Sequence, residues 1–232
     1  MSTIAPGLAG TTVTAAGTTG TRATLRLLLE SYARSAPPRS IAVVGNAPLS
    51  PDEVRAATID SADLVLRMTT FGLDAPGGPP TVGRRCDVVV LHRGITPSPF
   101  TFADYTGRLY LLFEQGRPFG ERQPLRPWWP ADLGVVPVSN YEFTRPLNDL
   151  LGLDSRERVW ATAGTLATFL CTELFPAATT YLTGVSLIDE PDQTTFEHHW
   201  GDAVRVTPEH RLRTESALLK QWIADGRIRF LP

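Results

Sequence analysis

Six runs along the chain predict β-strands. The first four are apolar at consecutive positions rather than at alternate ones, so both of their faces would be covered, as in a parallel sheet. Each run is bounded by polar or turn-forming residues. The runs are "SIAVVGN", "DLVLRM", "CDVVVLH", "RLYLLF", "TTYLTGVS" and "RIRFLP".

Four segments between these runs predict helices. Residues 21–36 carry apolar side chains at helical spacing, and two prolines end the segment. The other three helices are indicated by their termini. One begins with Ser50 as N-cap, one is entered at Thr162 or Thr165, and one runs from Thr207 as N-cap to Gly226.

Strands that alternate with helices predict an α/β fold: a Rossmann-like three-layer α/β/α arrangement with a mostly parallel sheet. The length of 232 residues suits one domain, which we place at residues 22–232. Residues 1–21, rich in threonine, glycine and alanine, predict a disordered tail. Residues 114–129 are rich in proline, arginine and tryptophan. They predict a long loop, of the kind that often acts as a lid or binding segment.

Composition narrows the classes of partner. A net charge of −2 and a pI near 6.1 indicate neither a nucleic acid nor a membrane surface. Cys86 and Cys171 are too few for a disulfide framework or a metal cluster. No apolar run is long enough to cross a bilayer, and the N-terminus lacks the pattern of a secretion signal. We therefore expect a cytoplasmic protein without a membrane span.

Two segments are candidate ligand sites by position. Gly45 and Asn46 follow the first strand, where ligands bind in doubly wound sheets, but neither dinucleotide nor phosphate-loop patterns are present. This leaves a tight turn, a nucleotide site and a methyltransferase site open. "TAGT" at 162–165 begins a predicted helix, where unpaired N–H groups suit an anion. Simple capping by threonine is the commoner alternative.

Three of the four histidines cluster near the C-terminus: His198, His199 and His210. Their spacing matches no common zinc pattern, which disfavours a metal site and leaves solvated polar residues as the ordinary reading. His210 and Glu215 lie five apart at the predicted start of the last helix. A helix N-terminus favours a neutral imidazole, the form that a general base requires.

Taken together, these segments resemble the eukaryotic-type sialyltransferases, glycosyltransferase family 29. The large motif of that family is similar to "IAVVGNAPLS", "IDSADLVLRM" and "TVGRRCD", and its small motif to "ATAGTLATFL" with "YLTGVS". Its third motif resembles "HHWG", and its last motif, a histidine followed by a glutamate, resembles "HRLRTE". The four blocks keep the family's order across most of residues 40–232, which implies a variant GT-A glycosyltransferase fold.

The resemblance also implies site residues. His210 would be the general base with Glu215 as its motif partner, and His198 would bind the donor phosphate, with His199 as the alternative register. The remaining positions would contact the nucleotide or the CMP-sugar. They are Gly45, Asn46, Thr69, Thr162, Ala163, Gly164, Thr165 and Gly184.

Two departures from the family bear on this assignment. Thr69 stands where the family has an asparagine that touches the nucleotide. Ile41 replaces the large-motif cysteine, and Cys171 comes too early in its helix to be the partner, so the family's disulfide is absent. The chain is also short for the family, which leaves the acceptor and the donor sugar open.

The function implied is a metal-independent inverting glycosyltransferase. It would use a CMP-activated sugar as co-substrate, require no cofactor, and act on a hydroxyl of a small-molecule or glycan acceptor. Three alternatives stay open: a CMP-sugar or CMP-nucleotide hydrolase, a natural-product tailoring enzyme, and a non-catalytic nucleotide-binding module. A methyltransferase is disfavoured, because no acidic residue is placed for a cofactor ribose after the second strand.

Overall fold

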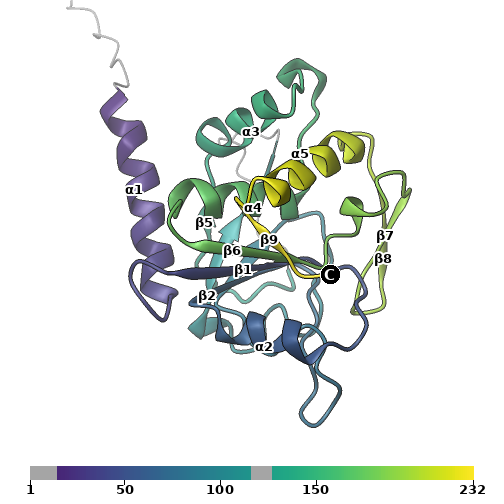
Figure 1. Cartoon of the computed structure of the whole chain (residues 1–232). Coiled ribbons are helices and arrows are strands. Elements are labelled where there is room, and N and C mark those ends of the chain that lie inside the picture. The colour runs from purple at the N-terminus through teal and green to yellow at the C-terminus, as the bar shows by residue number, and fades with distance from the viewer. Residues whose placement is uncertain (1–14, 116–126) are drawn as a thin grey trace, which may run out of the picture.

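The computed structural model describes residues 15–115 and 127–232, which form a sheet flanked by helices (Figure 1). The sheet has seven strands in the order β5-β4-β3-β2-β1-β6-β9, and every neighbouring pair is parallel. The strands are β1 (Ser40–Val44), β2 (Leu64–Met68), β3 (Val88–Leu91), β4 (Leu109–Leu112), β5 (Val136–Pro137), β6 (Thr179–Thr183) and β9 (Arg229–Phe230). The helices are α1 (Ala15–Tyr32), α2 (Glu53–Ser61), α3 (Arg145–Leu150), α4 (Ala163–Leu174) and α5 (Leu212–Ala224).

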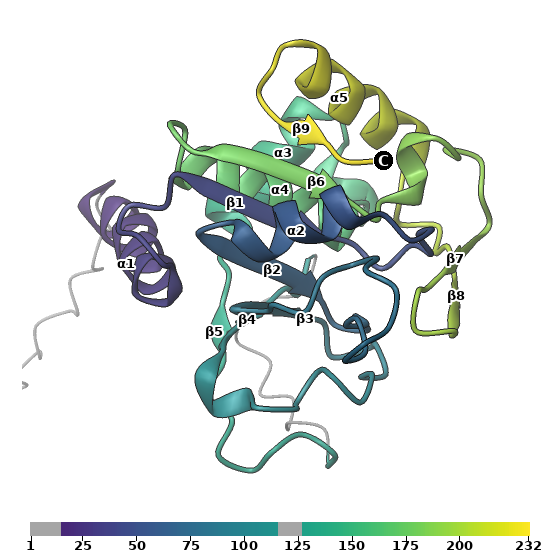
Figure 2. The ribbon, with the colours of Figure 1, turned by 60° about the horizontal axis from the view of Figure 1, so that its bottom comes forward.

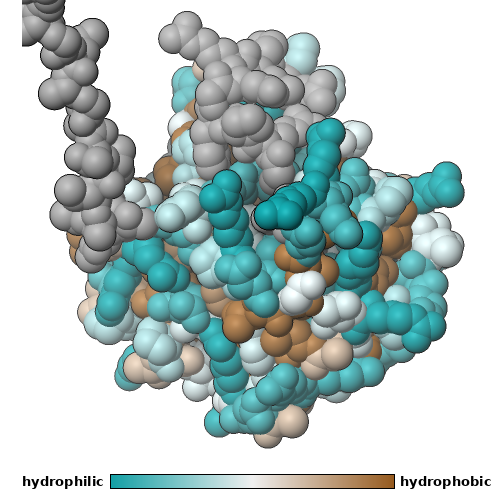
Figure 3. All heavy atoms as spheres, turned by 90° about the horizontal axis from the view of Figure 1, so that it is seen from above, coloured by the Kyte–Doolittle hydropathy of each residue, from teal (hydrophilic) through white to brown (hydrophobic). Residues whose placement is uncertain are grey.

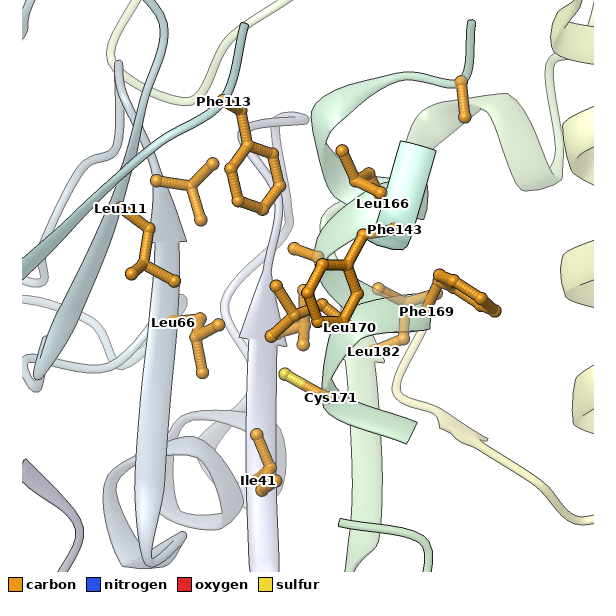
Figure 4. Packing of buried hydrophobic residues seen from close by; sticks show 14 of the residues in the cluster. Ile41, Leu66, Leu111, Phe113, Phe143, Leu166, Phe169, Leu170, Cys171 and Leu182 are labelled. Carbon is orange, nitrogen blue, oxygen red and sulfur yellow. The ribbon is translucent and has the colours of Figure 1, made fainter. Parts of the chain in front are cut away.

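Helices cover both faces of the sheet, as Figures 1 and 2 show. Alternate side chains of β1 point to opposite faces. Ile41 belongs to the larger buried cluster, which also takes residues from α1, α3, α4 and α5. Figure 4 shows part of this cluster, including Ile41 and the α4 residues Leu170 and Cys171. Ala42 faces the other way and packs with Ile59 of α2. The three-layer α/β/α fold predicted from the sequence is therefore confirmed.

All six predicted strands are present, and α4 begins where its threonine predicted, with Thr162 as N-cap. Four short elements lacked a sequence signal. They are β5, α3, the π-helical turn Asn140–Thr144, and the antiparallel hairpin of β7 (Thr195–Glu197) and β8 (Ala203–Arg205). Segments of two to six residues contain too few positions to show a period.

Three helix starts differ from the prediction. α1 begins at Ala15, inside the stretch assigned to the tail, whereas residues 1–14 lie outside the described part of the chain. α2 has Asp52 rather than Ser50 as its N-cap, since the Asp52 carboxylate accepts a hydrogen bond from the Arg55 N–H. α5 begins at Leu212, five residues after Thr207. Most of the predicted long loop, residues 116–126, also lies outside the described residues.

The sheet reverses its order at β1. Strands β2 to β5 follow one another on one side of β1, and β6 with β9 lies on the other side. In open α/β sheets the crevice for ligands forms at such a reversal, outside the carboxyl ends of the strands. The topology alone therefore places a ligand site after β1 and β6.

Two glycines meet at this point. A Cβ on Gly45 would lie 2.1 Å from the carbonyl oxygen of Gly184, and Gly184 has a φ of +63°. Ala47 N–H donates to that same oxygen at 3.0 Å, so the two turns are bound together by their backbones. Only glycine allows this approach, and it leaves the ends of β1 and β6 open to a ligand.

Among the described residues, no helix is both long and apolar enough to cross a membrane. The face shown in Figure 3 carries hydrophilic and hydrophobic residues interspersed, as most protein surfaces do. The large apolar side chains that are exposed come from separate parts of the chain: Leu27, Val54, Trp128, Tyr141, Leu150 and Trp200.

We predict that Gly45→Ala destabilises the protein by about 3 kcal/mol, because its methyl group overlaps a backbone oxygen that cannot move without breaking the Gly184 turn. Chemical denaturation of both proteins measures the change. Gly134→Ala is the matched control, since its Cβ would meet nothing within 4 Å. Equal stability of the two variants would contradict the proposed close packing of the two turns.

Candidate active site

A cavity of about 370 Å³ lies at the carboxyl ends of β1, β2 and β6. Its walls come from five regions: the turns after these strands, the ends of β3 and β4, the start of α4, the β7–β8 hairpin, and the segment before α5. Nine of the twelve predicted site residues line this cavity. The predicted residues that line it are Gly45, Asn46, Thr69, Thr162, Ala163, Gly164, Gly184, His198 and His210.

The start of α4 is anchored by Glu215, which comes from α5. The Oε2 atom of Glu215 accepts hydrogen bonds from the Thr162 N–H at 2.8 Å and from the Thr162 and Thr165 hydroxyls at 2.7 Å each. Thr165 and Glu215 are both 0 % exposed, and neither lines the cavity. Their arrangement makes Glu215 a positioning residue for α4.

The N–H groups of Ala163 and Gly164 are the part of this helix start that faces a ligand. Neither N–H donates a hydrogen bond to any described residue. The first helical hydrogen bond runs from the N–H of Leu166 to Thr162 O. Unpaired N–H groups at a helix N-terminus attract an anion. The threonine hydroxyls predicted to share this role are instead bonded to Glu215.

His210 does not lie in the first turn of α5 as predicted, but in a tight turn before it, where its N–H donates to Thr207 O. Its ring is fixed by the backbone: Nδ1 lies 3.1 Å from Trp160 O. Because a carbonyl oxygen only accepts, Nδ1 carries the proton. In the neutral ring Nε2 then has a lone pair, which is the arrangement of a general base.

His198 and His199 face different surroundings. His198 lines the cavity, and its Nδ1 lies 3.1 Å from the Asp202 carboxylate. The His199 ring instead lies against Gly72, and its backbone N–H donates to Asn46 O at 2.6 Å. Burial lowers the pKa of His199. Of the two registers considered, the geometry favours His198 as the group that meets a ligand.

Asn46 and Thr69 differ in what they offer. The Asn46 Oδ1 atom is enclosed and accepts no hydrogen bond within the described part of the chain, so it lacks the partner that a buried amide oxygen needs. The Thr69 hydroxyl is already bonded: it donates to Val90 O and accepts from the His92 N–H, both at 3.0 Å. Both residues line the cavity, but neither presents a free side-chain oxygen to it.

Several cavity residues were missed by the sequence analysis: His92, Gln115, Trp160 and Phe196. His92 and Gln115 each follow a buried strand, at the edge where parallel strands present their ligand-binding residues, and this position was the available signal. Phe196 lies on the β7–β8 hairpin, whose strands of three residues gave no signal. Trp160 contributes through its backbone carbonyl, which no motif reveals.

Within residues 15–115 and 127–232, no three His, Cys, Asp or Glu side chains are grouped to hold a metal ion. Both cysteines are free thiols. Burial raises the pKa of Cys86 to about 11 and that of Cys171 to about 12, so both are protonated near neutral pH.

Known proteins resemble this chain in structure rather than in sequence. No family model matches the chain, and no curated protein matches it. A crystal structure of a mammalian sialyltransferase aligns with 83% of this chain and 68% of its own, at a TM-score of 0.54 and 18% identity. The chain has a sialyltransferase fold. A second structure, of a mammalian sialyltransferase in complex with Gal-beta-1-3GalNAc-ortho-nitrophenol, aligns over 83% and 69% at a TM-score of 0.55 and 19% identity.

The sialyltransferase fold explains why the four sequence blocks meet. The large-motif block supplies the Gly45 turn, and the small-motif block supplies both Gly184 and the start of α4. The "HHWG" block forms the tip of the β7–β8 hairpin, and the last block brings Glu215 beneath α4. Blocks separated by more than a hundred residues thus surround one cavity.

We predict that Glu215→Ala lowers the free energy of unfolding by about 3 kcal/mol, because three donors at the start of α4 lose their acceptor in the interior. Denaturation in urea measures the loss. Glu53→Ala is the matched control: Glu53 also lies in the first turn of a helix but is exposed, so its removal should cost only about 0.5 kcal/mol. Similar losses in both variants would mean that the buried contacts contribute little.

Proposed function

We propose that the protein is a glycosyltransferase that transfers a sugar from a CMP-activated donor to a hydroxyl group, with inversion and without a metal ion. The observation that carries this proposal is the pairing of two features in one cavity. Ala163 and Gly164 present unpaired helix N–H groups. In the same cavity His210 presents the Nε2 lone pair of a ring whose Nδ1 proton is held by Trp160 O.

The nucleotide would lie at the reversal of the sheet. There Gly45 and Gly184 leave room for a ribose and base to approach the backbone, and Asn46 lines the cavity beside them. The phosphate would lie between the start of α4 and His198. Helix N–H groups stabilise the negative charge that develops as CMP departs, and His198 would add to this in its doubly protonated form, with Nδ1–H on Asp202 and Nε2–H toward the phosphate.

The reaction would be a single displacement. The acceptor oxygen attacks the anomeric carbon from the face opposite CMP, and CMP leaves with the electron pair of the glycosidic bond. His210 Nε2 takes the proton of the acceptor hydroxyl. A nucleoside monophosphate lacks the diphosphate that a divalent ion commonly bridges, so the N–H groups and His198 suffice for the leaving group in this proposal.

Ligand selectivity tests the donor assignment. Isothermal titration with CMP, UMP, GDP and S-adenosylmethionine, each with and without EDTA, should show selective binding of CMP that EDTA leaves unchanged. Binding of S-adenosylmethionine alone would contradict the proposed donor. Loss of CMP binding in EDTA would contradict the proposal that no metal ion is needed.

His210→Ala tests the base. We expect kcat to fall by roughly 10²–10⁴ while the Kd for CMP stays within about twofold, because the base contacts the acceptor and not the nucleotide. Turnover in the presence of CMP-sialic acid measures the loss, with water or a glycoside as acceptor. Added imidazole should restore part of the rate, which a merely misfolded variant would not show. Full activity in the variant would place the base elsewhere.

A further inference from the structure

Gln115 is the nearly buried polar residue of the cavity to which neither the sequence motifs nor the proposed chemistry assigns a role. It follows β4 by three residues, is 5 % exposed, and lines the same cavity as His210. The neighbouring backbone fixes its place. Phe113 N–H donates to Leu91 O at 2.8 Å, and Glu114 O accepts from the Asn140 side chain at 2.8 Å.

The orientation of the Gln115 amide follows from its single hydrogen bond. Nε2 lies 3.2 Å from Ala161 O, and because a carbonyl only accepts, the NH₂ end must face it. Oε1 is then the other end. It accepts no hydrogen bond among the described residues and is not one of the sealed interior atoms, so it is open to the cavity.

Gln115 and His210 are fixed in the same way. Trp160 and Ala161 are consecutive residues, and the carbonyl of the first accepts from His210 Nδ1 while that of the second accepts from Gln115 Nε2. Each side chain thus uses its donor on the backbone and presents an acceptor, Nε2 or Oε1, to the cavity. Glu114, beside the amide, is paired with Arg93 at 2.6 Å, which offsets its charge.

We propose that Gln115 Oε1 binds a second hydroxyl of the acceptor substrate while His210 deprotonates the first. Gln115 is then a residue that determines acceptor specificity, because it favours an acceptor with a second hydroxyl near the reacting one. Two lone pairs repel a carboxylate or phosphate but accept hydrogen bonds from two hydroxyls. This inference rests on the proposed function, because it names a residue that binds the acceptor, whose hydroxyl is the nucleophile of that reaction.

The test uses CMP-sialic acid as donor and the methyl glycosides of galactose, glucose and N-acetylgalactosamine as acceptors. Gln115→Met should raise the acceptor KM roughly tenfold, since a site built around a hydroxyl contact loses it. The Kd for CMP and the rate of donor hydrolysis by water should stay within about threefold. Gln193→Met is the control: its Nε2 also donates to a backbone carbonyl, that of Glu190, but Gln193 lies outside the cavity lining.

A second measurement does not depend on the folding of a variant. For the wild-type protein, removing one hydroxyl from the best glycoside, apart from the reacting one, should lower kcat/KM roughly tenfold. Gln115→Met should use that deoxy compound and its parent about equally, as a double-mutant cycle requires.

The outcomes separate the two proposals. Absence of CMP binding by the wild-type protein would overturn the proposed function and this inference with it. CMP binding and turnover with an unchanged acceptor KM in Gln115→Met, or with the deoxy penalty retained, would overturn the inference alone. Donor hydrolysis without transfer to any glycoside would also overturn it, because no acceptor hydroxyl would then be bound beside His210.

Discussion

The buried carboxylate of Glu215 is the interaction on which the site depends. Burying a carboxylate is costly unless donors bond to it, and here an N–H and two hydroxyls at the start of α4 converge on Oε2, whereas Oε1 has no partner among the described residues. The contact fixes α4 against α5. Because His210 lies five residues before Glu215, the same contact fixes the distance between the helix N–H groups and the imidazole.

The second constraint is the backbone contact between Gly45 and Gly184. It brings the turns after β1 and β6 together without side chains, at the reversal of the strand order. The two constraints act on adjacent parts of one cavity. The glycines shape the part that we propose for the nucleotide, and Glu215 holds the helix start that we propose for its phosphate.

The sequence predicted well those elements that are determined by residues close together along the chain. The runs around Val43, Leu66 and Val90 each hold three or four consecutive apolar residues, so burial on both faces and the parallel sheet followed directly. The start of α5 was predicted wrongly because Thr207 and Pro208 look like a helix start. That turn instead closes at His210, whose ring is held by Trp160 O, fifty residues away. Gln115 was not predicted for the same reason: the carbonyl that fixes its side chain, that of Ala161, is distant in the sequence.

The cavity is divided by hydrogen-bond polarity. The wall at the start of α4 presents N–H donors, because helix geometry leaves its first N–H groups without partners. The wall that carries His210 and Gln115 presents acceptors, because the carbonyls of Trp160 and Ala161 occupy the donors of both side chains. In the displacement that we propose, the donors would meet the departing anion and the acceptors would meet the hydroxyl that loses its proton. The backbone of residues 160–164 supplies both halves of it, since the two carbonyls and the helix start lie in one short segment.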